Sequence, residues 1–191
     1  ARAGSSLAAC PLRALLKSSG TEAGTDVSPS VTVRIDNRAT VCDSVGNTSG
    51  ALAQMHDNRA VVVTISDRCS AGDAIDRSGP EIVDCLPLVA GRLIHRETIP
   101  DDIERIREVA ERWLGRTELL ITTGGTGIAE RDVTPEAFAP LIEKHLPGFG
   151  EVMRLKAYER LPLAIISRAG AGVARQTLVI WPPGSTRAVR E

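Results

Sequence analysis

Short apolar runs with strand character alternate with segments of helical period along residues 58–191. Five runs predict buried strands, at residues 61–66, 93–99, 119–121, 163–166 and 177–181. Four intervening segments predict helices, at residues 79–89, from Asp101 or Asp102 to Trp113, at 135–145 and at 150–158. Strands that alternate with helices predict an α/β fold, with a mostly parallel sheet covered by helices on both faces.

Residues 1–57 lack such a pattern. They contain none of the five aromatic residues of the chain, are rich in Ser, Gly, Thr and Ala, and show one short strand-like patch at residues 31–35. Such a segment buries too little apolar surface to offset its ordering entropy, so it predicts a disordered tail, a leader or a misassigned extension. Residues 187–191 resemble the opening turn of a helix, and we expect the folded domain at 58–191 to be truncated there.

Composition narrows the function classes. A length of 191 residues with 42% hydrophobic content suits one good core, and the net charge of −1 offers no electrostatic attraction for nucleic acid or an anionic membrane. No apolar run approaches the roughly 18 residues that span a bilayer. The cysteines (Cys10, Cys42, Cys69 and Cys85) are too widely spaced to predict a zinc site or a disulfide framework, so we expect a cytoplasmic protein.

The richest segment is a glycine loop at residues 121–136. Gly124, Gly125 and Gly127 follow a predicted strand, and Thr134-Pro135-Glu136 is typical of a helix start. Backbone N–H groups of such a loop can approach an anion, which predicts a phosphate cradle with Asp132 at its edge. Many glycine-rich turns bind nothing, however, and both GxxxxGK[ST] and a GxGxxG after the first strand are absent.

Polar residues follow every predicted strand. They are Ser66-Asp67-Arg68, Asp101, the glycine loop, Ser167-Arg168 and Gly184-Ser185. Each alone is typical of a turn, but ligands of open parallel sheets bind outside the carboxyl ends of the strands, which predicts one shared site.

Carboxylates, hydroxyls and arginines dominate these loops, and Cys69 is the one His or Cys among them. This set suits Mg²⁺ and phosphate rather than acyl transfer. Asp101 and Asp132 would hold the metal, and Arg68, Arg77 or Lys156 would offset phosphate charge.

Several motifs together resemble the MoaB/Mog family of molybdenum cofactor biosynthesis over about residues 59–191. They are Ser66-Asp67-Arg68, Asp76-Arg77-Ser78-Gly79-Pro80, Ile99-Pro100-Asp101, Thr122-Thr123-Gly124-Gly125-Thr126-Gly127, Arg131-Asp132-Val133-Thr134-Pro135-Glu136, Pro147-Gly148-Phe149-Gly150-Glu151 and Pro183-Gly184-Ser185. The resemblance implies a three-layer α/β/α fold and a molybdopterin adenylyltransferase. Such an enzyme transfers AMP from ATP to the molybdopterin phosphate with Mg²⁺ and releases pyrophosphate. A homotrimer and handover of the product to a molybdotransferase are implied as well.

The resemblance assigns residues by position. Asp101 and Asp132 match the catalytic, metal-binding aspartates. The implied substrate-binding residues are Ser66, Asp67, Arg68, Ser78, Gly79, Thr123, Gly124, Gly125, Thr126, Gly127, Glu151, Ser167, Gly184 and Ser185. Trp181 and Pro182 depart from the family pattern, which often has Asn and Leu there. Trp181 either stacks on a pterin or packs in the core, and we favour packing.

Three alternatives stay open. A non-catalytic sister in the same family would bind pterin or nucleotide without transferring AMP, although retention of Asp101 and Asp132 argues against it. The related domain of molybdotransferases is disfavoured by the motif at residues 131–136. A scaffold role leaves the shared edge of polar loops unexplained.

Overall fold

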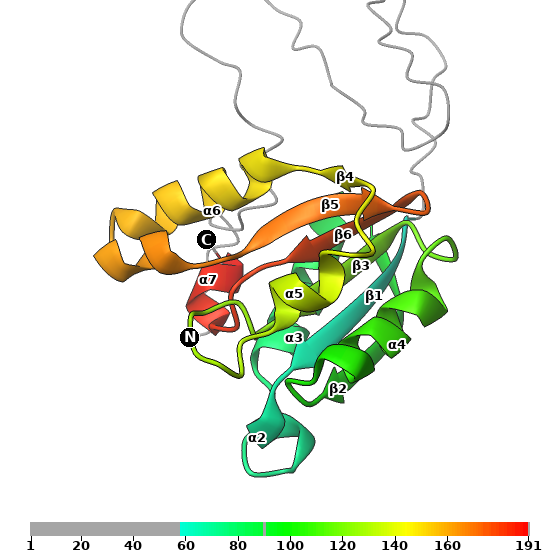
Figure 1. The fold of residues 1–191 in the computed structure, drawn as a ribbon, viewed down its shortest axis with the longest axis horizontal. Coiled ribbons are helices and arrows are strands. Elements are labelled where there is room, and N and C mark those ends of the chain that lie inside the picture. Colours follow the sequence, from blue (N-terminus) through cyan, green and yellow to red (C-terminus); the bar gives the residue numbers. More distant parts are fainter. Residues whose placement is uncertain (1–57, 90, 191) are drawn as a thin grey trace, which may run out of the picture.

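The computed structural model describes residues 58–89 and 91–190 (Figure 1), so the expectations for residues 1–57 lie outside the described part. Its strands are β1 (Asn58–Ile65), β2 (Gly91–Ile99), β3 (Leu119–Thr123), β4 (Lys144–His145), β5 (Gly170–Ala174) and β6 (Thr177–Trp181). Its helices are α2 (Asp67–Ser70), α3 (Ser78–Cys85), α4 (Ile103–Trp113), α5 (Thr134–Phe138), α6 (Pro147–Tyr158) and α7 (Thr186–Arg190), with 3-10 helices η2 (Leu86–Val89) and η3 (Pro162–Ile166).

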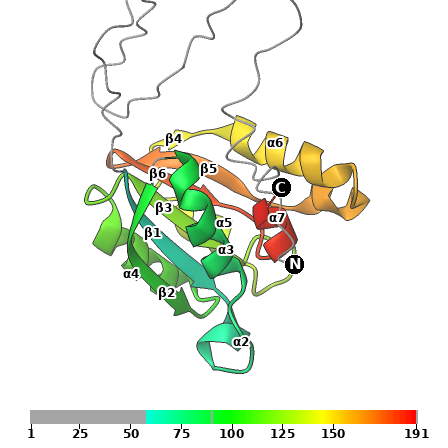
Figure 2. The same cartoon turned by 180° about the vertical axis from the view of Figure 1, so that it is seen from behind.

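The strands form one sheet in the order β2-β1-β3-β6-β5-β4. The first four of these are parallel, while β5 pairs antiparallel with both β6 and β4. Helices cover both faces, as Figures 1 and 2 show from opposite sides. Core residues of α4 and α5 pack on one face, and core residues of α3 and α7, with partly buried Phe149 of α6, pack on the other. The three-layer α/β/α architecture is confirmed.

The interior is built from the β-branched runs that the sequence pattern singled out. Val61 and Val63 of β1 face the α4 and α5 layer, whereas Val62 faces the α3 layer. All three are at most 1% exposed, as expected for a central strand covered twice. No helix within residues 58–89 and 91–190 has the length and apolar character needed to cross a bilayer.

The prediction of a strand at residues 163–166 is wrong. Those residues form η3, where Leu163 and Ile165 are 68% and 64% exposed, so the apolar run does not report burial. The strand forms instead at β5, whose sequence Gly-Ala-Gly-Val-Ala carries little strand propensity. Cross-strand packing explains the choice: a Cβ at Gly170 would lie only 3.0 Å from the Trp181 ring.

The predicted helix at 135–145 is also wrong over its second half. The helix α5 ends at Phe138, whose carbonyl accepts the N–H groups of Leu141 and Ile142 in a closing turn. The chain then pairs with β5 as the short edge strand β4. The predicted helix at 79–89 is similarly divided, because α3 ends at Cys85 and η2 follows.

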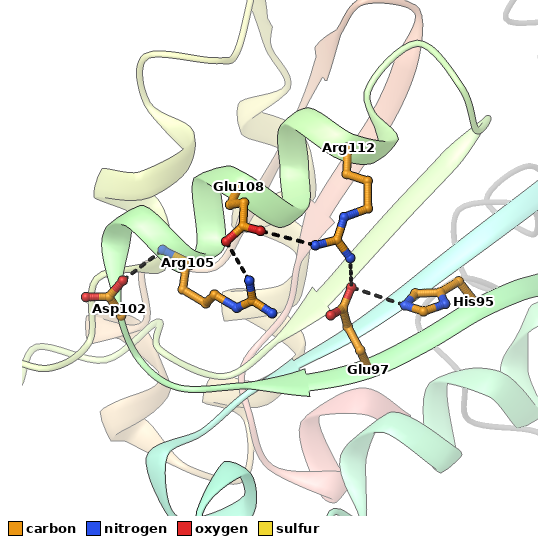
Figure 3. Close-up of polar contacts among 6 residues, drawn as sticks. All are labelled: His95, Glu97, Asp102, Arg105, Glu108 and Arg112. Carbon is orange, nitrogen blue, oxygen red and sulfur yellow. Dashed lines mark hydrogen bonds and ion pairs between the residues drawn. The ribbon is translucent and has the colours of Figure 1, made fainter.

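The helix α4 is attached to the edge strand β2 by charged side chains (Figure 3). Its N-cap is Asp102, whose carboxylate accepts the Arg105 N–H at 2.8 Å. Arg112 reaches from the last turn to Glu97 of β2 at 3.3 Å. Glu97 also contacts His95 at 3.1 Å. Because this helix follows directly after Asp101, these contacts fix the loop at the end of β2 from one side.

Candidate functional site

The carboxyl ends of β1, β2, β3 and β6 surround a cleft of about 440 Å³. Predicted residues that line it are Ser66, Asp67, Arg68, Arg77, Ser78, Asp101, Thr123, Gly124, Gly125, Asp132, Gly184 and Ser185. Residues as far apart in the sequence as Ser66 and Ser185 therefore meet where the topology of a parallel sheet places ligands.

The loops after β1 and β2 are tied together by two aspartates. The Asp67 N–H donates to Asp101 Oδ2, and the Asp101 N–H donates to Asp67 Oδ1, both at 2.9 Å. Ser66 continues β1 through its N–H bond to the Ile99 carbonyl, and its Oγ accepts the Cys69 N–H as the N-cap of α2. This reciprocal pairing fixes both carboxylates at the mouth of the cleft.

The glycine loop after β3 adopts conformations that require glycine. Gly124 and Gly125 have φ values of +105° and +61°. A Cβ at Gly124 would lie 2.1 Å from the Ile65 carbonyl oxygen, and one at Gly125 would lie 2.4 Å from Thr134 Oγ1 and 3.0 Å from Asp101 Oδ1. Thr134 closes the loop, because its Oγ1 donates to the Gly124 carbonyl at 2.9 Å and its N–H to the Gly125 carbonyl at 3.0 Å.

Asp132 is held by the loop to which it belongs. Its Oδ2 accepts the Ala129 N–H at 2.9 Å, and its own N–H donates to the Ala129 carbonyl at 2.9 Å. Gly127 leaves room for this carboxylate, since a Cβ there would lie 2.6 Å from Asp132 Oδ2. The second carboxylate oxygen, Oδ1, is therefore the one left for a ligand.

Burial and neighbouring charge raise the pKa of Asp101. Removal of the carboxyl from water is the largest cause, and the carboxylates of Asp67 and Asp132 raise the pKa further. The Asp67 N–H and the Arg131 guanidinium act in the opposite direction. Three carboxylates thus repel one another at one edge of the cleft, which favours occupation by a cation.

The donor set fits Mg²⁺ bound through one or two carboxylates. Within the described ranges, no group of three or more His, Cys, Asp or Glu side chains is arranged to hold a metal by itself. Magnesium commonly binds proteins through one or two carboxylates and completes its shell with water and phosphate oxygens. Asp101 and Asp132 meet that requirement, and the missing Cβ of Gly125 leaves space beside Asp101.

Several predicted residues lie outside the lining of the cleft. Gly79 is behind its wall, where a Cβ would collide with Asp76 and Thr64, and Thr126 is 4% exposed in the core. Gly127 packs on Asp132 rather than lining the cleft. The remaining ones, Glu151, Lys156 and Ser167, belong to α6 or follow η3, and the structure does not bring them to the cleft.

The structure adds cleft residues that sequence reasoning missed. Asp76 joins the start of α3 to β1, because its carboxylate accepts the Thr64 hydroxyl and the Gly79 N–H, both at 2.9 Å. Arg131 contributes a cation beside Asp101. Both lie inside recognised motifs, at Asp76-Arg77-Ser78 and Arg131-Asp132, so their motif positions were the available signal.

Trp181 packs in the core, as expected. Its ring is 7% exposed and stacks on Phe138, with 5.4 Å between ring centroids. Its Nε1–H donates to the Arg168 carbonyl at 3.2 Å. The tryptophan that departs from the family pattern at this position is therefore a packed core residue.

The family of the chain follows from comparison with known proteins. The family model described as "Probable molybdopterin binding domain" matches residues 61–191, which include the whole cleft. The chain belongs to this family. The MoaB/Mog resemblance carried by its motifs is confirmed.

Relatives in this molybdopterin-binding family include named enzymes. The chain is 39% identical over 134 residues to the molybdopterin adenylyltransferase of Helicobacter pylori J99, covering 68% of this chain and 76% of that one. It is 40% identical over 141 residues to gephyrin of Dictyostelium discoideum, with 68% of this chain covered, but spans only 20% of gephyrin. The crystal structure of the molybdopterin biosynthesis enzyme MoaB from Thermus thermophilus superposes with a TM-score of 0.65 at 36% identity, covering 70% of this chain and 85% of that one.

Proposed function

We propose that the protein is a molybdopterin adenylyltransferase. The observation that carries the proposal is the convergence of two aspartates, a strained glycine loop and several arginines on one cleft, in a chain 39% identical to an enzyme with that name. Its substrates would be ATP and molybdopterin, and its products adenylylated molybdopterin and pyrophosphate.

The proposed reaction needs positioning more than proton transfer. An oxygen of the molybdopterin terminal phosphate attacks the α-phosphorus of ATP, and the bond from that phosphorus to the bridging oxygen of the β-phosphate breaks. The bonding electrons leave with pyrophosphate. Because the attacking phosphate is already ionised, a strong general base is unnecessary, and the cleft lining contains no histidine.

The cationic and anionic residues of the cleft would have different roles in binding ATP and Mg²⁺. Exposed backbone of the glycine loop would face the phosphates, and Arg68, Arg77 and Arg131 line the same cleft. These guanidinium groups would offset the negative charge that ATP brings near Asp101 and Asp132. Mg²⁺ held by the two aspartates would supply further neutralisation of the phosphates and of leaving pyrophosphate.

The direct test follows product formation with Mg²⁺, ATP and molybdopterin. Wild-type protein should release pyrophosphate and form adenylylated molybdopterin when both substrates are present together. Asp132→Asn should abolish this turnover while thermal melting stays cooperative, because the amide keeps the size of the carboxylate but loses its charge. Asp84→Asn is the matched control on the exposed surface of α3, and it should retain wild-type turnover.

The same assay distinguishes the alternative in this family. Binding of molybdopterin without product by the folded wild-type protein would refute the transferase and favour a non-catalytic sister. Unchanged turnover in Asp132→Asn would refute the assigned role of this aspartate while leaving the reaction intact.

We also propose a homotrimer that delivers its product to a molybdotransferase. Support for self-association comes from apolar side chains exposed along α6 and η3, namely Leu155, Tyr158, Leu161, Leu163, Ile165 and Ile166. Exposed apolar side chains concentrated in one segment of the chain are typical of protein interfaces.

The trimer is tested by the molar mass in solution. Light scattering should give three times the mass of one chain, and Leu163→Glu should lower this molar mass. A monomeric wild-type protein would refute the trimer.

A further inference from the structure

We infer that Arg168 is a positioning residue, which anchors the loop at residues 127–132 and thereby places the Asp132 carboxylate in the cleft. The role of Asp132 itself rests on the proposed function. The anchoring rests on contacts that are independent of any reaction.

One guanidinium group contacts both ends of this loop. Arg168 Nε donates to the Gly127 carbonyl at 2.7 Å, and Nη2 donates to the Asp132 carbonyl. Nη1 pairs with the Glu136 carboxylate in α5, and the Arg168 N–H donates to the Thr126 carbonyl at 2.8 Å. The planar fork of an arginine suits several acceptors held in fixed directions.

The interior of the loop offers no comparable anchor. Its tip is exposed, with Ile128 71% exposed and Ala129, Glu130 and Arg131 also on the surface. Inside the loop, Asp132 bonds to Ala129 through both its N–H and its carboxylate. Because the Asp132 carboxylate is tied to the loop backbone, a displacement of the loop also displaces the carboxylate.

Arg168 is itself fixed from the opposite side. Its carbonyl accepts the Nε1–H of the buried Trp181. It lies two residues before β5, whose first residue Gly170 pairs with Trp181. The guanidinium therefore connects the rigid β5–β6 pair to the exposed loop. A lysine at this position keeps the charge but cannot satisfy three separated acceptors with one ammonium group.

Arg154 provides a matched control. Its Nη1 donates to the carbonyls of Ser167 and Ala169, both at 3.2 Å, so it holds the two neighbours of Arg168. In the described part of the chain, the hydrogen bonds of Arg154 go to residues 167 and 169 and not to the loop at 127–132. Arg168→Lys and Arg154→Lys thus make the same chemical change, but only the first removes contacts with the loop at residues 127–132.

The test measures amide hydrogen exchange of residues 127–132 in the full chain, together with adenylyl transfer and its Mg²⁺ activation constant. Arg168→Lys should speed exchange of the Ala129 and Asp132 amides by about tenfold or more, because the bonds between these two residues cross a loop whose ends, at Gly127 and Asp132, are no longer held by one guanidinium. It should also lower kcat at least about tenfold and raise the Mg²⁺ activation constant. Arg154→Lys should change none of these. Glu136→Ala, which removes the acceptor of Nη1 alone, should give a smaller increase in exchange. This variant tests the anchoring if Arg168→Lys fails to fold.

Unchanged exchange in Arg168→Lys would overturn the anchoring. Faster exchange with unchanged kcat and Mg²⁺ activation would overturn the positioning of Asp132. Equal effects from Arg154→Lys would mean that any loosening of residues 167–169 moves the loop, with no specific role for Arg168, and would likewise overturn the inference. If the wild-type protein transfers no AMP, the proposed function fails, and the exchange comparison still decides the anchor.

Discussion

The substitution Gly125→Ala tests whether the glycine loop is shaped by steric limits at the cleft. Gly125 has a φ of +61°, and an added Cβ would lie 2.4 Å from Thr134 Oγ1 and 3.0 Å from Asp101 Oδ1. Gly72 at the end of α2 offers a matched control, since its φ is +83° and a Cβ would meet nothing within 4 Å. Comparison of the two separates the cost of the backbone conformation from the cost of crowding.

The expected magnitudes follow from these contacts. A left-handed alanine costs about 1–2 kcal/mol, so Gly72→Ala should lower the free energy of unfolding by about that amount. Gly125→Ala adds a steric overlap, and overpacking of this kind costs about 1–3 kcal/mol more. The overlap also pushes Thr134 away from the Gly124 carbonyl, which it now contacts at 2.9 Å.

Urea denaturation of both variants gives the free energies, and adenylyl transfer per folded molecule gives the functional effect. Gly125→Ala should lose turnover, because its Cβ displaces Thr134 or Asp101, while Gly72→Ala should keep it. Equal losses of stability in the two variants would refute the steric argument. Full turnover in Gly125→Ala would show that the loop tolerates a side chain beside Asp101.

Three further substitutions test single features. The pKa of Asp101 is raised in the folded state, so this residue makes the free energy of unfolding fall as pH rises from its ordinary pKa of 3.8 through the raised value. Asp101→Asn should flatten this fall, measured by urea denaturation at several pH values without divalent cations. An unchanged dependence of the free energy of unfolding on pH would contradict the prediction. Asp102→Ala removes the N-cap of α4 and should cost about 1 kcal/mol in thermal melts while turnover persists. Trp181→Ala should cost about 3–5 kcal/mol in urea without raising KM for either substrate, whereas a raised KM would indicate a ligand contact.

The sequence predicted those elements whose residues have strong local preferences. The strands β1, β3 and β6 are rich in Val, Ile, Leu and Thr, and α4 has a capping aspartate before an amphipathic run. The strand β5 escaped prediction because its Gly and Ala residues are selected by contact with Trp181 and by a Cβ-free approach to Ile142 at Gly172. Such cross-strand requirements are not visible in a local pattern.

The same reasoning explains which part of the candidate site was predictable. Residues after parallel strands, such as Ser66, Asp101 and Gly124, could be placed on one edge because strand direction alone determines their side of the sheet. Glu151 was assigned through family resemblance, and Ser167 was also placed after a predicted strand at 163–166, which is the 3-10 helix η3. The structure leaves both outside the cleft of one chain. Their assigned contacts with substrate stay predictions.

The position of Arg168 is not explained by the rule that residues of a site follow the carboxyl ends of parallel strands. The sequence interpretation placed it after a parallel strand, whereas it precedes the antiparallel strand β5. Because β5 runs opposite to β6, its amino end lies beside the carboxyl end of β6, at the Gly170 and Trp181 pair. An antiparallel neighbour can therefore supply a residue to the carboxyl edge of a parallel sheet from the start of its strand. In this protein that residue is the arginine whose guanidinium contacts both ends of the Asp132 loop, so the reversal of β5 is what allows the sheet to support the loop.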